Sequence, residues 1–205
     1  MKVLLVNGSP DERGCVFTAM KEISNALENA GIATEIFPIG NQSVRGCNGC
    51  WSCKELKKCI YDDLVNDFAL KFEKCDGLVI GSPVYFASAN GSVISFLDRL
   101  FFSTPFSKTM KVGAAIVNAR RGGCSSTFDV LNKYFTISGM PIAASQYWNS
   151  VHGYKPEDTL KDEEGLQTMR VLGQNMAFLI KSIALGKEKY GLPEKEAKVF
   201  TDFIR

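Results

Sequence analysis

Residues 2–10 read KVLLVNGSP, and this stretch decides the fold class. Lys2 to Asn7 predicts a strand buried on both faces, because its apolar residues form a continuous run. Gly8 to Pro10 then breaks the strand. From Val16 to Gly31 the apolar residues recur with the period of an amphipathic helix, and Gly31 ends it. The chain therefore begins with a strand, a loop and a helix.

The same alternation continues along the chain, with short apolar strands followed by amphipathic helices. This pattern predicts an α/β fold with a doubly wound, five-stranded parallel sheet covered by helices on both faces. Further strands are expected at Thr34–Ile39, Gly77–Ile80, Val112–Val117 and Pro141–Ala144, and further helices at Leu64–Phe72, Val93–Phe101, Phe128–Phe135 and Glu164–Leu185.

Length and composition limit the classes of protein to consider. The chain has 205 residues, 45% of them hydrophobic, so we expect one domain over residues 1–205. Lys and Arg number 24 against 22 Asp and Glu, a net charge of +2. That balance is too small to favour nucleic acid or an anionic membrane as a partner.

The cysteines indicate a reducing compartment. The number of cysteines, seven, is odd, and four of them crowd into residues 47–59, unlike a secreted disulfide framework. The apolar run after Lys2 is too short for a signal peptide or a membrane span. We therefore expect a cytoplasmic protein.

Ligands of doubly wound sheets bind beyond the carboxyl ends of the strands, so the loops there are the first places to seek a site. The loop Asn7 to Thr18 places backbone N–H groups and the hydroxyls of Ser9 and Thr18 at a helix N-terminus, which attracts phosphate. It has neither the Gly-x-Gly-x-x-Gly spacing nor a Gly-Lys-Ser/Thr triplet, so a monophosphate fits better than a dinucleotide or triphosphate. The alternative is an ordinary strand-to-helix turn.

Two further loops carry aromatic and basic residues. Gly81 to Phe86 ends in two aromatic side chains, which suit a planar ring or, alternatively, only cover the core. Asn118 to Gly123 contains Arg120 and Arg121, which would stabilise an anionic ring edge or, alternatively, are solvated surface charges.

Four motifs together resemble a known family: NGSP at Asn7–Pro10, SPVY at Ser82–Tyr85, FLDR at Phe96–Arg99 and NARRGG at Asn118–Gly123. In this order they look like the NAD(P)H-dependent FMN reductase family of flavodoxin-like proteins. The cysteines of residues 47–59 make the chain similar to the iron–sulfur flavoprotein branch. The resemblance implies a flavodoxin-like sheet with strand order 2-1-3-4-5.

The resemblance also implies where FMN binds and that the chain forms a homodimer or homotetramer. The sequence departs from the commoner family loop at Asp11, where an Arg usually follows Ser-Pro, so the choice between NADH and NADPH stays open. The implied FMN contacts are Ser9, Val16, Phe17 and Thr18 for the phosphate, Pro83, Val84, Tyr85 and Phe86 for the ring, and Ala119, Arg120, Arg121 and Gly122 for its pyrimidine edge.

The clustered cysteines Cys47, Cys50, Cys53 and Cys59 have the spacing C-x2-C-x2-C-x5-C. Thiolates at such intervals can wrap a [4Fe-4S] cluster, with Cys59 as the fourth ligand. Zinc is an alternative, although structural zinc sites usually bring two separated C-x2-C pairs. A third possibility is a set of thiols that binds no metal.

The expected function is an FMN-dependent NAD(P)H oxidoreductase that passes electrons to a small acceptor such as a quinone, nitro or azo compound. No catalytic acid or base is expected, because the flavin carries the chemistry. The main alternative is an iron–sulfur flavoprotein that takes electrons from ferredoxin through a cluster on the four cysteines. A further alternative is a cofactor-free redox sensor.

Overall fold

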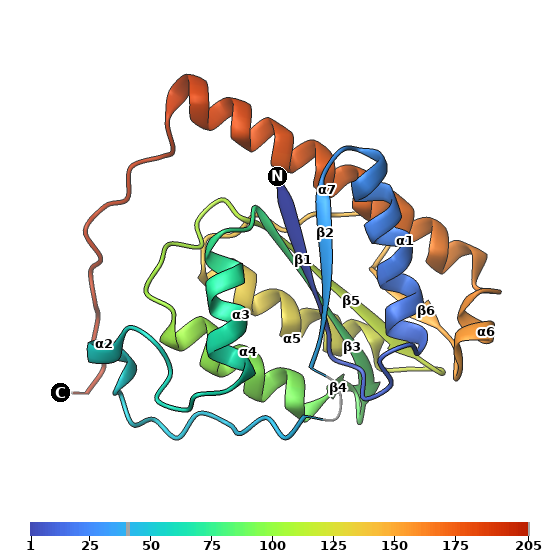
Figure 1. Cartoon of the computed structure of the whole chain (residues 1–205), viewed down its shortest axis with the longest axis horizontal. Coiled ribbons are helices and arrows are strands. Elements are labelled where there is room, and N and C mark those ends of the chain that lie inside the picture. The colour runs from blue at the N-terminus through green and yellow to red at the C-terminus, as the bar shows by residue number, and fades with distance from the viewer. Residues whose placement is uncertain (40–41, 205) are drawn as a thin grey trace.

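A parallel sheet with helices on both faces forms the centre of the computed structural model, which describes residues 1–39 and 42–204 (Figure 1). The sheet order is β2-β1-β3-β5-β6, and β4 pairs antiparallel with the end of β3. The strands are β1 (Lys2–Asn7), β2 (Ala33–Pro38), β3 (Gly77–Tyr85), β4 (Ser88–Ala89), β5 (Val112–Ala119) and β6 (Ser150–His152).

Helices cover both faces of this sheet, so side chains that alternate along each strand enter two separate cores. In β1, Val3 and Leu5 pack with α1 and α7, whereas Leu4 and Val6 pack with α3, α4 and α5. The helices are α1 (Cys15–Asn29), α2 (Cys53–Leu56), α3 (Leu64–Glu73), α4 (Gly91–Ser103), α5 (Cys124–Ile137), α6 (Pro156–Thr159) and α7 (Glu163–Tyr190).

The predicted α/β fold with a parallel sheet is confirmed, but the strand count and order need correction. The expected order 2-1-3-4-5 omits β4, so the parallel strands are β2-β1-β3-β5-β6 in the structure. The hairpin of β3 and β4 turns at Phe86 and Ala87, both with positive φ. Such turns usually carry Gly or Asn, so the residues at these two positions did not predict a hairpin.

The strand expected at Pro141–Ala144 is wrong. There the chain makes only an isolated bridge between Gly113 and Ile142, and the last parallel strand is β6. The side chain of Asn149 donates to the carbonyl of Ala115 at 3.1 Å, so a side chain satisfies the β5 backbone where a strand was expected. Apolar character alone could not distinguish Pro141–Ala144 from β6 as the last strand.

Two strands extend further than expected, which changes the site. The third strand continues past Ile80 through Pro83 to Tyr85, and the fourth continues to Ala119. Beyond Gly81, β3 pairs with β5 but no longer with β1, so the missing N–H of Pro83 is tolerated at this half-free position. Residues expected in loops therefore lie on strands.

Polar residues cap two of the helices that cover the sheet. Asp63 accepts a hydrogen bond from the backbone N–H of Val65 at the start of α3. Asn90 accepts a hydrogen bond from the backbone N–H of Ser92 in α4 in the same way.

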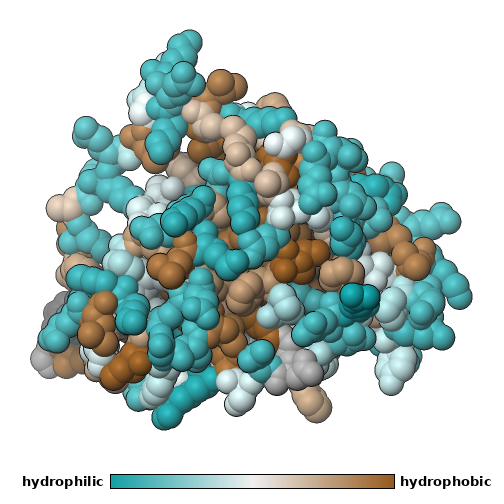
Figure 2. Space-filling view, in the orientation of Figure 1, coloured by the Kyte–Doolittle hydropathy of each residue, from teal (hydrophilic) through white to brown (hydrophobic). Residues whose placement is uncertain are grey.

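Figure 2 shows hydrophilic residues over most of one face, with apolar residues in scattered patches between them. Among the described residues, no helix is both long and apolar enough to span a bilayer.

Candidate functional site

A cleft of about 440 Å³ lies at the carboxyl ends of β1, β3, β5 and β6, and we refer to it as the strand-end cleft. Its volume falls in the usual range for small-molecule sites. The position is where doubly wound sheets bind ligands. It is lined by Ser9, Pro10, Asp11, Gly14, Cys15, Val16, Pro83, Val84, Tyr85, Asn118, Ala119, Arg120, Gly153 and Tyr154.

The loop after β1 is held close to β3 by backbone contacts. The N–H of Gly8 donates to the carbonyl of Gly81 at 2.9 Å. A Cβ atom on Gly8 would lie 2.0 Å from a methyl of Val93 and 2.7 Å from that carbonyl, so only glycine fits. The buried side chain of Asn7 accepts from the N–H of Ser9 at 3.0 Å. These contacts fix the loop that forms one wall of the cleft.

The N-terminus of α1 opens at this wall without a cap. Its N-cap residue is Gly14, and among the described residues no side chain caps the helix and no acid lies in its first turn. Thr18 donates from both its N–H and its hydroxyl to the carbonyl of Gly14, at 3.0 and 3.2 Å. The first-turn N–H groups of Cys15 and Val16 are therefore available to an anion.

The second wall is the β3–β4 hairpin, which is tied to the first. Asn90 donates through Nδ2 to the carbonyl of Gly8 at 3.1 Å, which joins the hairpin to the loop after β1. At the hairpin tip Phe86 and Ala87 have φ values of 51° and 57°, a conformation that costs roughly 1–2 kcal/mol per residue. Ser126 of α5 donates to the carbonyl of Ala87 at 2.7 Å and supports this tip.

A second group of candidate residues gathers in a small pocket of about 20 Å³, which we refer to as the cysteine pocket. All four clustered cysteines line it, and all seven cysteines of the chain are free thiols. Cys59 is buried, Cys53 is half-buried, and Cys47 and Cys50 are exposed. The other lining residues are Asn48, Trp51, Ile60, Tyr61, Arg99, Phe102 and Ser103.

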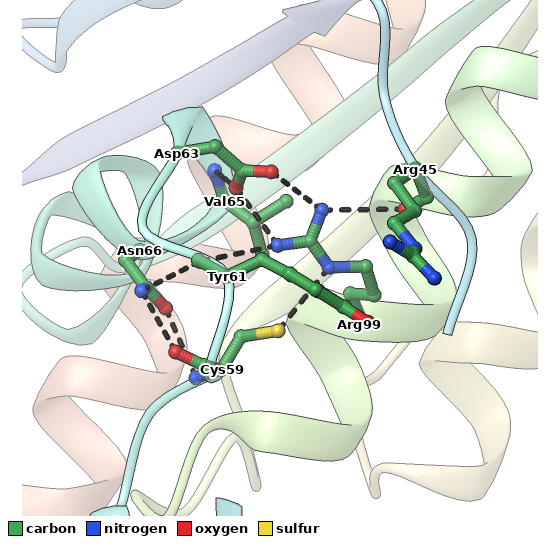
Figure 3. A network of polar contacts seen from close by, with 7 residues as sticks. All are labelled: Arg45, Cys59, Tyr61, Asp63, Val65, Asn66 and Arg99. Atoms are coloured by element: carbon green, nitrogen blue, oxygen red, sulfur yellow. Dashed lines mark hydrogen bonds and ion pairs between the residues drawn. The ribbon is translucent and has the colours of Figure 1, made fainter. Parts of the chain in front are cut away.

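Arg99 lines the cysteine pocket, and its guanidinium joins three chain segments (Figure 3). Its Nε donates to Sγ of Cys59 at 3.2 Å. Its Nη atoms donate to the carboxylate of Asp63 at 2.6 and 2.8 Å, and to the carbonyls of Arg45 and Tyr61. Burial opposes the charge of Arg99, but the bonds to Asp63 and Cys59 outweigh it and raise the pKa of the guanidinium.

The backbone of Cys59 is held by a second side chain, that of Asn66. Asn66 accepts from the N–H of Cys59 and donates to its carbonyl, both at 3.0 Å. Its amide also donates to the carbonyl of Tyr61 at 3.0 Å. Cys59 is therefore fixed at both its backbone and its sulfur, as Figure 3 shows.

The comparison with known families decides the identity of the chain. The NADPH-dependent FMN reductase family matches residues 1–155, three quarters of the sequence. The chain belongs to this family. FMN is the cofactor of these reductases, and the resemblance drawn from the four motifs is confirmed.

Curated relatives place this FMN reductase family member near iron–sulfur flavoproteins. One from Methanocaldococcus jannaschii is 32% identical over 194 residues, covering 89% of this chain and 99% of that protein. Another, from Methanosarcina thermophila, is 26% identical over 197 residues, covering 92% and 100%. The name iron–sulfur flavoprotein belongs to these two relatives.

Solved structures confirm the flavodoxin-like fold of this family member. A flavodoxin from the domain Archaea superposes with a TM-score of 0.60 at 16% identity, covering 88% of this chain and 99% of that one. A flavone reductase superposes with a TM-score of 0.69 at 16% identity, covering 90% and 64%. At these identities the likeness concerns the fold alone.

The strand-end cleft brings together seven of the twelve FMN contacts that the family resemblance implied, from all three predicted segments. Phe17, Thr18, Phe86, Arg121 and Gly122 do not line it, and Phe86 is fully exposed. All twelve stay predictions as FMN contacts. The lining residues among them are Ser9, Val16, Pro83, Val84, Tyr85, Ala119 and Arg120.

Several cleft residues were not among the predicted FMN contacts, most notably Tyr154 and Asp11, which the sequence marked only as a departure from the family loop. Asp11 brings a carboxylate to the wall where an anion would bind. Tyr154 follows β6 closely. Because the last strand was expected at Pro141–Ala144, the position of Tyr154 near a strand end could not be recognised. The motif residue Asn118 donates to the carbonyls of Val151 and Gly153 and thereby holds the chain after β6 against the cleft.

A thiol and an imidazole also meet near the strand ends. Sγ of Cys124 lies 3.9 Å from Nε2 of His152, whose Nδ1 lies 3.6 Å from the carboxylate of Asp162. Cys124 and His152 are 28 positions apart, so their spacing along the chain does not reveal this contact. Burial raises the pKa of the Cys124 thiol and therefore disfavours the thiolate.

The chemistry of the donor set in the cysteine pocket fits an iron–sulfur cluster better than a hard metal ion. Four thiols line the pocket, and no carboxylate or imidazole does. Within residues 1–39 and 42–204, however, no three His, Cys, Asp or Glu side chains lie close enough to hold a metal ion. A cluster would therefore require the exposed thiols to move toward Cys59.

Proposed function

We propose that the chain is an FMN-dependent NAD(P)H oxidoreductase that binds FMN in the strand-end cleft. The observation that carries this proposal is the uncapped N-terminus of α1 at the wall of a ligand-sized cleft. An uncapped helix N-terminus suits a monophosphate, and the hydroxyl of Ser9 lies on the same wall. The chain belongs to a family of FMN reductases, which supports FMN as the ligand.

The remaining cleft residues suit the flavin ring. Pro83 to Tyr85 offers a stiff backbone and an aromatic side chain, both suited to a flat ring. Arg120, where β5 ends, brings a positive charge to the cleft. When bound, FMN supplies the chemistry of accepting a hydride and passing on its electrons. Arg120 would stabilise negative charge on the pyrimidine side of the ring.

A single cleft would serve the nicotinamide and the acceptor in turn. The acceptor class we propose is a small quinone, nitro or azo compound. The exposed aromatic residues Phe86 and Tyr154 near the cleft suit contact with a second copy of the chain, and we propose a homodimer or homotetramer. The free thiols fit a reducing cytoplasm.

The test is anaerobic mixing of the FMN-loaded protein with NADH or NADPH while flavin absorbance is followed. The proposal predicts bleaching by at least one nicotinamide and reoxidation by a quinone. Initial rates at varied nicotinamide and quinone should give parallel lines, the pattern of a ping-pong reaction. Failure of both nicotinamides to bleach the flavin would overturn the proposal.

The second candidate is an electron-transfer iron–sulfur flavoprotein that takes electrons from ferredoxin. It is favoured by one observation, that Cys47, Cys50, Cys53 and Cys59 all line one pocket. The relatives named iron–sulfur flavoproteins support it. Iron and sulfide analysis of anaerobically purified protein, beside nicotinamide turnover, separates the candidates. Cluster without nicotinamide turnover favours this second function.

A further inference from the structure

The four cysteines differ sharply in how firmly the fold holds them. Cys59 is only 8% exposed, and Asn66 holds its backbone on both sides. Cys47 and Cys50 are exposed, and Cys53 lies on the four-residue helix α2. One sulfur is therefore in place within the fold, while the segment that carries the other three lies at the surface.

The fixed sulfur receives its hydrogen bond from a buried cation. Arg99 is 1% exposed, and its five N–H donors are all engaged. Four of them serve the ion pair with Asp63 and two backbone carbonyls. Only the Nε donor faces Sγ of Cys59, at 3.2 Å. Because the planar guanidinium is held at its other end, this one donor has a fixed direction toward the sulfur.

We propose that Arg99 is the positioning residue of the iron–sulfur site. It holds Sγ of Cys59 in place as one ligand, and its hydrogen bond and charge would raise the reduction potential of a cluster shared with Cys47, Cys50 and Cys53. The potential rises because a hydrogen bond to a ligand sulfur and a nearby positive charge both favour the reduced, more negative cluster. This inference rests on the iron–sulfur site of the second candidate function.

If Arg99 served only the stability of the fold, its substitution would have a different effect on the cluster. Arg99 and Asp63 form one ion pair, so a role confined to stability makes loss of either partner act alike. The proposed role makes them act differently. Loss of Arg99 removes a positive charge and the bond to sulfur, whereas Asp63→Asn removes a negative charge and leaves the Nε donor in place. The reduction potential of the cluster should therefore differ between the two variants.

The experiment uses the full chain, reconstituted anaerobically with ferrous iron and sulfide. Iron and sulfide per chain, the midpoint potential of the cluster and its rate of loss to a chelator are measured for wild type, R99M, R99K and D63N. R99M should shift the potential to more negative values and lose its cluster about tenfold faster. R99K, which keeps the charge, should show a smaller shift of the same sign. D63N should show no negative shift.

The outcomes separate this inference from the site on which it rests. Wild-type protein that takes up neither iron nor sulfide overturns the iron–sulfur site and Arg99's role with it. A cluster in R99M with wild-type potential and retention overturns the role of Arg99 alone. So does an equal negative shift in R99M and D63N. If R99M does not fold, R99K against D63N decides by the same criterion.

Discussion

The carboxylate of Asp63 performs two tasks at once, because it caps α3 and forms the ion pair with buried Arg99. Oδ1 accepts from the N–H of Val65 at 3.0 Å, and both oxygens accept from the guanidinium at 2.6 and 2.8 Å. Asp63 thereby connects the start of one helix to the middle of another. The cysteine pocket is built on this connection.

Replacing Asp63 should therefore cost more than the loss of an ordinary helix cap. D63A removes the cap and leaves a buried cation without its carboxylate, so we expect a loss of about 3 kcal/mol in the free energy of unfolding. D63N keeps an oxygen for the cap and should lose clearly less. Urea unfolding of both variants measures the difference. Equal losses would mean that the cap contributes nothing.

Gly8 should resist even the smallest substitution. A methyl group there would collide with Val93 and with the carbonyl of Gly81, so G8A should lose about 2 kcal/mol or more and weaken FMN binding. The matched control is G91A at the start of α4, where nothing lies within 4 Å of an added Cβ. We expect that control to unfold at or above the wild-type temperature. Thermal unfolding compares the two, and a stable G8A would contradict the close packing of this loop.

The carboxylate of Asp11 should weaken phosphate binding in the strand-end cleft. D11N keeps an oxygen that can accept from the N–H of Arg13, as Oδ1 does at 3.0 Å, but removes the negative charge. We expect a roughly three- to tenfold lower Kd for FMN, corresponding to about 1 kcal/mol of repulsion. Riboflavin, which has no phosphate, serves as the control ligand and should bind both proteins alike. A change for both flavins would show that the effect is not electrostatic.

Much of this architecture could be read from the sequence because burial leaves a periodic pattern. The continuous apolar run of β1 and the helical period of α1 predicted their positions within one or two residues. These features depend on local residues, so one sequence is enough to reveal them.

The parts that failed depend on distant contacts or on a backbone conformation that their residues disfavour. β6 was misplaced because its pairing with β5 is set partly by the side chain of Asn149. The hairpin at Phe86 was missed because its conformation goes against the preference of its residues. Arg99 was recognised only as a motif residue, since its bond to Cys59 spans 40 positions. None of these contacts leaves a local pattern in the sequence.

Lys108 should make stability depend on pH. It is 8% exposed, and burial, with a contribution from Lys111, lowers the pKa of Lys108 to about 8. The unfolded chain loses this proton only near pH 10.4, so between about pH 8 and 10.4 the unfolded state binds more protons and stability rises with pH. K108M removes this effect. It should therefore be more stable than wild type at pH 7 by on the order of 1 kcal/mol.

The check on Lys108 is the difference in unfolding free energy between wild type and K108M at pH 7, 8, 9 and 10. The advantage of the variant should shrink steadily above pH 8. Burial also raises the pKa of Cys75, to about 11, but that thiol is present in both proteins and cancels in the difference. A difference that stays constant from pH 7 to 10 would argue against a destabilised charge at Lys108.

The central claim is that the strand-end cleft holds one FMN per chain. Titration of the purified, flavin-free protein with FMN, followed by quenching of flavin fluorescence, tests it most directly. We expect saturation at one FMN per chain, with riboflavin bound more weakly because it lacks the phosphate for the N-terminus of α1. Protein that remains colourless and quenches no added FMN would contradict the account.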